Sequence, residues 1–178
     1  MEILNEIPQL NEIYDRSDHV LNLLSWLKSK PDTALHLKGV RGSLDALLIS
    51  SVFKQSKKSI LLLANDFEEA AYLLNDLQHL IGEHELLYFP ASFKRPYQFE
   101  EIDNANVLRR SETLTRLNDN KPYLIVSYGA AIAEKVINKR TLIDNTVSIR
   151  MGDNLDLDTI QEQLVNFGFE QTDFVYEA

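Results

Sequence analysis

The strongest fold signal in the chain is the segment Ser59-Ile60-Leu61-Leu62-Leu63-Ala64, an apolar run bounded by Lys57-Lys58 and Asn65-Asp66. A segment that is apolar at every position is typical of a central parallel strand, because such a strand is covered on both faces. Further apolar runs predict strands at 34–37, 86–89 and 123–127, and an alternating stretch predicts an edge strand at 146–150. Helical periodicity fills the intervals. We therefore expect an α/β fold in which a parallel sheet is flanked by helices.

The helices are expected at 4–28, 44–53, 65–81, 104–117, 129–136 and 157–167. Asn65 is a candidate N-cap, with Glu68 three residues later as in a capping box. Asp156 can cap the last helix, and Gly168 suits the C′ position after it. The helix at 104–117 should bury four apolar side chains, namely Val107, Leu108, Leu114 and Leu117.

Composition excludes several classes of protein. The formal net charge of −9 opposes a free-standing DNA-binding domain, which needs a basic surface for phosphate groups. The absence of cysteine excludes disulfides, thiolate zinc sites and cysteine nucleophiles. The four histidines show no metal-ligand spacing, and no set of residues indicates catalysis. We also expect no signal peptide and no membrane span, which favours a cytoplasmic location.

A glycine loop lies between the expected strand at 34–37 and the helix at 44–53, where a phosphate loop would sit. The working motif is G-x-x-x-x-G-K-[ST]. With Gly39 as its first glycine, Leu44 replaces the second glycine, Asp45 replaces the lysine, and Ala46 replaces the hydroxyl residue. A carboxylate at the lysine position repels a triphosphate.

Three interpretations of this loop stay open at the level of sequence. Gly39 and Gly42 can serve only to make a tight turn into the helix, Ser43 and the helix N-terminus can retain a weak anion site, or the loop can bind ATP despite its departures from the motif. In the first two interpretations Gly39, Gly42, Ser43 and Asp45 form a vestigial phosphate loop, and no bound cofactor is expected.

Four basic residues gather after the strand at 86–89, namely Lys94, Arg95, Arg109 and Arg110, with Phe93 and Tyr97 among them. Basic and aromatic residues together are typical of a nucleic-acid or partner surface. An ordinary solvated loop followed by a helix start explains the same pattern, so both interpretations remain.

Four segments, taken in order, resemble the transcription-repair coupling factors of bacteria. They are LKGVRGS at 37–43, YFPASFKRP at 88–96, NVLRRSETL at 106–114 and GFEQTDFVYE at 168–177. The same layout is similar to the first domain of the excision-repair subunit UvrB, in which the phosphate loop is intact. The departures at Leu44, Asp45 and Ala46 favour the coupling factors.

The resemblance implies that this is the amino-terminal, non-catalytic module of a large ATP-dependent DNA translocase. Such a protein removes stalled RNA polymerase and recruits UvrA for nucleotide excision repair. ATP, magnesium and DNA would be bound by a helicase-like motor further along the chain. The module itself would dock UvrA and be held against a carboxy-terminal domain.

The resemblance also implies a UvrB-like domain at 1–147 and the opening segment of a UvrA-docking domain at 148–178. The principal UvrA contacts would lie beyond Ala178, so no UvrA-binding residue is assigned. The alternative is a self-standing nucleotide-binding enzyme with an atypical phosphate loop.

Overall fold

The computed structural model describes residues 12–29, 32–82, 84–93, 102–119, 121–144, 146–147, 149–169 and 172. The chain forms two compact units, Met1–Lys135 and Val136–Ala178, which are treated separately below. The domain boundary expected at residue 147 stays a prediction.

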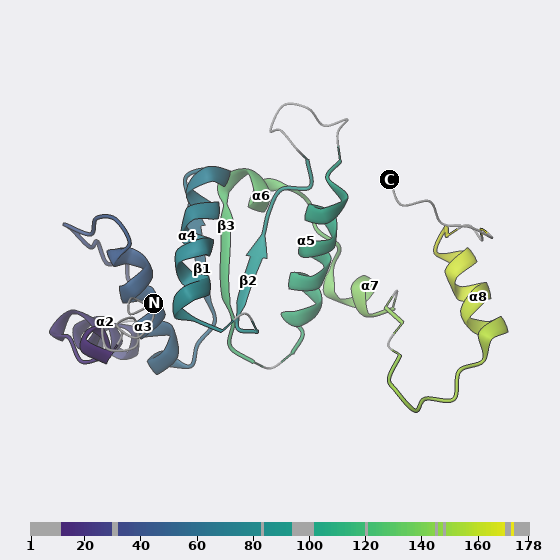
Figure 1. The fold of residues 1–178 in the computed structure, drawn as a ribbon, viewed down its shortest axis with the longest axis horizontal. Helices are drawn as coiled ribbons and strands as arrows, with labels where there is room; N and C mark the ends of the chain where they lie inside the picture. The colour runs from purple at the N-terminus through teal and green to yellow at the C-terminus, as the bar shows by residue number, and fades with distance from the viewer. Residues whose placement is uncertain are drawn as a thin grey trace, which may run out of the picture. The chain divides into compact units, whose positions relative to one another are not determined.

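The first unit is built on a three-stranded parallel sheet (Figure 1). Its strands are β1 (Ile60–Ala64), β2 (Leu86–Phe89) and β3 (Leu124–Tyr128), and their spatial order is β1-β3-β2. Leu62 of β1 and Tyr88 of β2 both pair with Val126 in the middle strand. The expected class, a parallel sheet with helices packed against it, is confirmed.

The central strand is β3, all five residues of which are buried. The prediction that 59–64 is a central strand is wrong, because β1 lies at an edge of the described sheet. Leu61 and Leu63 are 52% and 60% exposed. An apolar run indicates that a strand can be buried on both faces. Whether the strand lies at the centre or at an edge of the sheet depends on which other segments pair with it.

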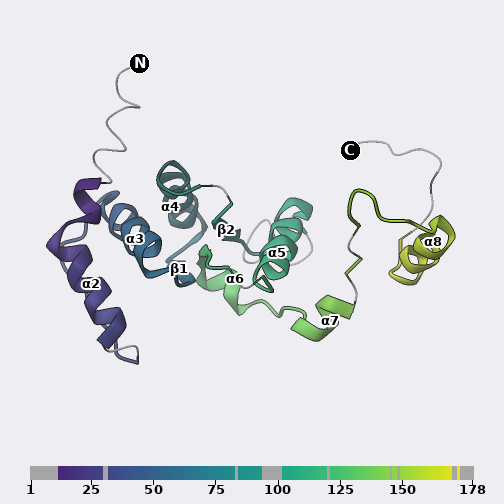
Figure 2. The same cartoon turned by 90° about the horizontal axis from the view of Figure 1, so that it is seen from below.

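The helices of this unit whose bounds lie within the described residues are α2 (Asp18–Ser29), α3 (Leu44–Ser56), α4 (Phe67–Leu80), α5 (Asn104–Arg116) and α6 (Gly129–Ala133). The main core lies between α4 and the sheet, where Leu77 packs with Leu124 and Val126. Seen from below, α4 and α6 lie on opposite sides of the strands and α5 lies beside β2 (Figure 2). A second cluster joins Val20 of α2 to Leu48 of α3.

Two expected strands are absent from the described residues. Residues 34–37 form no strand, and Leu35 and Leu37 are about half exposed. Around the second segment, residues 146–147 and 149–150 are likewise not strands, and Ile149 is exposed. Apolar and alternating patterns supply strand propensity, yet a strand forms only where a neighbour satisfies its backbone groups.

Two helix starts differ from expectation. The helix expected at 4–28 is interrupted at Ser17, whose hydroxyl accepts the Val20 N–H at 3.4 Å, and α2 then begins at Asp18. The N-cap of α4 is Asp66 rather than Asn65, because Asp66 Oδ1 accepts the Glu69 N–H at 2.9 Å. Glu69, not Glu68, reaches back and accepts the Asn65 N–H at 2.7 Å.

The buried face of α5 also differs from the prediction. Val107, Leu108 and Leu117 are exposed, whereas Arg110 and Thr113 are buried. Polar contacts decide this orientation: Thr113 Oγ1 donates to the Tyr88 carbonyl at 3.1 Å, and Arg110 donates to two further buried carbonyls described below. Helical periodicity is assigned from apolar side chains alone, so it does not predict hydrogen bonds made by buried polar side chains.

The second unit contains α7 (Lys139–Asp144), which the sequence did not predict, and α8 (Leu157–Asn166). Asp156 caps α8 by accepting the Asp158 N–H at 3.1 Å, as expected. Gly168 has φ 86°, and the Phe169 N–H donates to the Leu164 carbonyl at 3.0 Å, which confirms the predicted C′ glycine. No helix among the described residues is long and apolar enough to cross a membrane.

Candidate functional site

The glycine loop leads directly into α3 but is not preceded by a strand. Gly39 and Gly42 have φ values of 84° and 58°. These left-handed conformations favour glycine by themselves, without any ligand close to the backbone. Ser43 occupies the N-cap position of α3, and its side chain makes no capping hydrogen bond.

Asp45 places its own negative charge at the start of α3. Its Oδ1 accepts the Ala46 N–H at 2.6 Å, so the carboxylate takes one of the helix N-terminal donors that a bound phosphate would use. The side chain expected to repel a triphosphate is therefore also a competitor for the same backbone group.

The four basic residues divide into three groups in the structure. Lys94 and Arg95 lie outside the described residues. Arg109 is exposed, whereas Arg110 is 6% exposed and belongs to the core. Arg110 is therefore not available to a nucleic acid in this structure.

Arg110 connects three separate parts of the first unit. Its Nη1 donates to the Pro90 carbonyl at 2.7 Å and to the Ala131 carbonyl at 2.9 Å. Its Nη2 lies 3.4 Å from Glu134 Oε2, and its guanidinium carbon lies 4.1 Å from the centroid of the Phe89 ring. Burial lowers the pKa of Arg110, while the charge of Glu134 opposes that shift.

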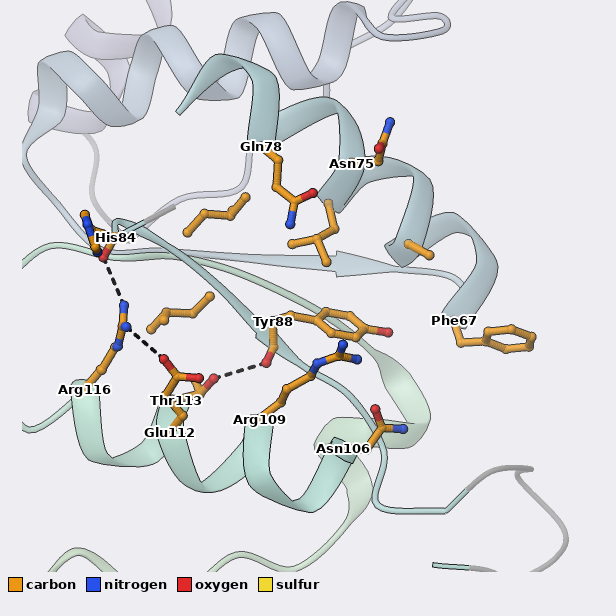
Figure 3. A pocket seen from close by; sticks show the side chains of 14 residues that line it. Phe67, Asn75, Gln78, His84, Tyr88, Asn106, Arg109, Glu112, Thr113 and Arg116 are labelled. Atoms are coloured by element: carbon orange, nitrogen blue, oxygen red, sulfur yellow. Dashed lines mark hydrogen bonds and ion pairs between the residues drawn. The ribbon is translucent and has the colours of Figure 1, made fainter. Parts of the chain in front are cut away.

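Arg109, the neighbouring residue, points instead into a groove of about 630 Å³ between α4 and α5 (Figure 3). The floor of this groove is β2, with Leu86 and the half-buried Tyr88. The side chain of Arg109 extends toward the Tyr88 ring (Figure 3). We refer to this feature as the α4–α5 groove.

Both helices contribute polar side chains to the α4–α5 groove. Asn75 and Gln78 come from α4, and Asn106 comes from α5 one turn before Arg109. Phe67, which is 53% exposed, lies at the start of α4 on the same groove. Amide groups, an aromatic ring and a guanidinium together can bind a ligand that carries both polar and negatively charged groups.

Of the two arginines that line the groove, one is paired with another described residue and one is not. Arg116 Nη2 lies 2.8 Å from Glu112 Oε1, and Arg116 Nη1 donates to the His84 carbonyl at 3.3 Å. Arg109 has no hydrogen-bond or ion-pair partner among the described residues. Burial raises the pKa of Tyr88, the charge of Tyr128 raises it further, and the charge of Arg109 lowers it.

Sequence reasoning singled out Arg109 but missed the rest of the groove. Asn106 and Arg109 are three residues apart and share a face of α5, which is a signal that a helical reading can find. Asn75 and Gln78 gave no such signal, because only the packing of α4 brings them opposite α5. No group of three or more histidine, aspartate or glutamate residues in the described part of the chain could hold a metal ion.

Comparison with known proteins links the chain to one family. It is 24% identical over 137 residues to a transcription-repair-coupling factor of Staphylococcus aureus (strain bovine RF122 / ET3-1), and equally to that of Staphylococcus haemolyticus (strain JCSC1435). The factor of Bacillus subtilis (strain 168) is 22% identical over 139 residues. The chain carries a region distantly similar to transcription-repair-coupling factors. No family model and no solved structure matches it.

The match covers 77% of this chain but only 12% of the Staphylococcus aureus protein. The chain therefore spans about 12% of the length of the curated coupling factors that it matches. The resemblance to coupling factors expected from the four segments is confirmed. The similarity of this chain to the first domain of UvrB stays a prediction.

Proposed function

We propose that this chain is a non-catalytic module of a bacterial transcription-repair coupling factor. The observation that carries the proposal is the coupling-factor similarity over 77% of the chain. The glycine loop supports the proposal that the module is non-catalytic. Asp45 stands at the lysine position of the motif, and its Oδ1 accepts the Ala46 N–H at 2.6 Å.

In this proposal the complete protein is an ATP-dependent DNA translocase that removes stalled RNA polymerase and recruits UvrA in the cytoplasm. ATP, magnesium and DNA are bound by a motor outside these 178 residues. The present chain supplies protein-docking surfaces, with a UvrB-like domain followed by the opening segment of a UvrA-docking domain. In the resting protein, an intramolecular contact with a carboxy-terminal domain keeps the module from docking UvrA.

The α4–α5 groove is the docking surface that the geometry supports best in the described part of the first unit. Asn75, Gln78 and Asn106 offer donors and acceptors suited to a peptide backbone. Arg109, which has no ion-pair partner among the described residues, suits a carboxylate. An acidic segment of a protein partner combines both features.

A calorimetric titration with Mg-ATP separates this proposal from a self-standing nucleotide-binding enzyme. We expect no saturable heat at millimolar nucleotide, because neither the lysine nor the hydroxyl that the motif requires is present. Saturable binding would favour the enzyme alternative. Titration with sodium phosphate serves as the control for a residual anion site at Ser43.

Membership of a larger coupling factor needs a separate test. A chimera can be made in which this chain replaces the matching region of the Bacillus subtilis relative. We expect the chimera to displace stalled RNA polymerase from DNA with retained ATP hydrolysis, because the motor is untouched. A chimera that folds and hydrolyses ATP yet fails to support excision repair would count against an equivalent docking role.

A further inference from the structure

We propose that the α4–α5 groove selects a polypeptide segment that presents a single carboxylate, and that Glu112 is the residue that excludes polyanions such as nucleic acids. This inference rests on the docking role proposed above for the groove and specifies what the groove accepts. It is carried by three side-chain amides, by one arginine that has no ion-pair partner among the described residues and by a second arginine that has one.

The side-chain amides of the groove suit an extended main chain. Asn75 and Gln78 lie three residues apart on α4, and Asn106 lines the groove from α5 (Figure 3). None of these three amides makes a hydrogen bond with another described residue. An extended segment has free N–H and C=O groups that can pair with amides, whereas the main-chain groups of a helix are already bonded to one another. The groove therefore favours an extended polypeptide over a helical one.

The charges along α5 leave one cation available in the groove. Arg109 has no ion-pair partner in the described part of the chain, so its guanidinium can bind a carboxylate. Two turns later, Arg116 Nη2 lies 2.8 Å from Glu112 Oε1, and both side chains line the groove (Figure 3). Among the lining residues that carry a full charge, two arginines and one glutamate leave one net positive charge.

The spacing of the two arginines explains why Glu112 excludes a second negative charge. Seven residues of an α-helix span about 10.5 Å along its axis, and three residues of an extended chain span about 10 Å. A ligand with two carboxylates at that spacing places the first at Arg109 and the second beside Arg116. There Glu112 already neutralises the guanidinium and repels further negative charge.

A nucleic acid is disfavoured by the same arrangement. It carries a negative charge on every nucleotide, so part of the strand must lie beside Glu112 when another part lies at Arg109. The formal net charge of −9 on the whole chain adds to this repulsion. A polypeptide can carry one acidic residue among uncharged ones and meets no such penalty.

Four capped peptides of about eight residues measure this selectivity by fluorescence anisotropy. They consist of uncharged polar residues, except that one has a central glutamate and two have a second glutamate three residues before or after it. We expect the single-glutamate peptide to bind the whole chain with saturation, and the peptide without glutamate to bind at least about tenfold more weakly, because the charge-assisted bond to Arg109 is lost. The second glutamate should not strengthen binding to the wild type by more than about twofold.

Glu112→Gln is the deciding variant. It keeps an oxygen beside Arg116 but removes the negative charge, so the groove gains a second available cation. We expect one of the two diglutamate peptides to bind this variant at least about fivefold more tightly than the single-glutamate peptide does. An oligothymidylate of about eight nucleotides, which should not bind the wild type at low micromolar protein, should bind the variant with an affinity that falls as salt is raised.

Two further variants serve as controls. Glu162→Gln removes the same charge from α8, and Glu162 does not line the groove, so all four peptide affinities should stay unchanged. Arg109→Gln should abolish the preference for the peptide with glutamate. Circular dichroism of each variant confirms that it is folded.

The Bacillus subtilis chimera described above tests whether the segment comes from a separate protein. A separate partner requires the groove to stay open in the longer protein, so the single-glutamate peptide should bind the chimera and this chain with similar affinity. At least about tenfold weaker binding to the chimera would make a segment of the longer protein the occupant and would overturn the assignment to a partner.

Three other results would overturn the proposed selectivity. Equal affinities of the wild type for peptides with and without glutamate would show that Arg109 binds no carboxylate. Saturable binding of the oligothymidylate to the wild type would make a nucleic acid the ligand. A folded Glu112→Gln variant with the ligand preferences of the wild type would remove Glu112 as the selective residue, while the docking role of the groove would stand. The ATP titration and the repair assay of the chimera judge the proposed function separately.

Discussion

The buried Arg110 and the half-buried Glu134 form an ion pair that joins α5 to the end of α6, with 3.4 Å between Nη2 and Oε2. Glu134 in turn accepts the Ser92 N–H at 2.9 Å, so the pair also holds the chain that leaves β2. Three segments far apart in the sequence are thus held by two charged side chains.

Replacing Arg110 with alanine should destabilise the first unit. The change leaves the Pro90 and Ala131 carbonyls without their donor and Glu134 without its cation. We expect a loss of about 3 kcal/mol in the free energy of unfolding, measured by urea denaturation. Arg110→Lys should recover little of it, because an ammonium cannot reproduce the planar fork of a guanidinium.

Arg109→Ala is the matched control for that experiment, and we expect it to change the free energy of unfolding by less than about 0.5 kcal/mol. Equal losses for the two neighbouring arginines would show that Arg110 does not have the structural role described here.

The pKa of Tyr88 should rise when Arg109 is replaced by glutamine. The positive charge of Arg109 lowers this pKa, although burial and Tyr128 raise it overall. Without that charge, deprotonation of the phenol becomes less favourable. Ring-labelled NMR spectra recorded against pH give the pKa, with Tyr88→Phe to assign the signal.

Arg116→Gln is the comparison in that titration, because Arg116 is paired with Glu112 at 2.8 Å. It should leave the pKa of Tyr88 nearly unchanged. An unchanged pKa in Arg109→Gln would show that the Arg109 side chain does not lie toward Tyr88.

Asp45→Lys alone should not create an ATP site. Leu44 still places a side chain where the motif needs close backbone approach, and Ala46 still lacks a metal-binding hydroxyl. Calorimetry with Mg-ATP should give no saturable heat for this variant. The same change removes an acidic residue from the first turn of α3, so we expect a small loss of stability, on the order of 0.5 kcal/mol. Saturable binding by the single variant would contradict our account of the loop.

The stability of α8 should depend on pH through Asp156. A hydrogen bond from the Thr159 hydroxyl, followed by one from the Asp158 N–H, lowers the pKa of Asp156. The folded state therefore favours the carboxylate, and this stabilisation is present above the unfolded value of about 3.9. It is lost as the pH falls through the lowered folded value.

Amide hydrogen exchange along α8 measures that dependence, with slower exchange at pH 6 than at acid pH after correction for intrinsic rates. Asp156→Ala should abolish the contribution. Asp153→Ala, which removes a carboxylate bonded to the Arg150 N–H at 2.8 Å, is the control and should retain it. Identical profiles in the wild type and Asp156→Ala would rule out the cap as the source.

Local chemistry in the sequence determined several features of this protein. The strand at Leu86–Phe89, the α8 cap at Asp156 and the glycine at 168 follow from propensity and from hydrogen bonds between near neighbours. The absence of the motif lysine and hydroxyl residue from the glycine loop can also be identified from the sequence, because a motif depends on residue type and spacing. The coupling-factor similarity was also contained in the sequence.

Only the tertiary structure decided which segments are neighbours. It placed Ile60–Ala64 at an edge of the described sheet, left Leu35 and Leu37 unpaired, and turned Arg110 rather than Leu108 toward the core. It also brought Gln78 of α4 opposite Arg109 of α5 to form the groove. The physical reason is that strand pairing, ion-pair burial and cavity shape depend on contacts between residues distant in the chain, whereas periodicity and capping depend on residues a few positions apart.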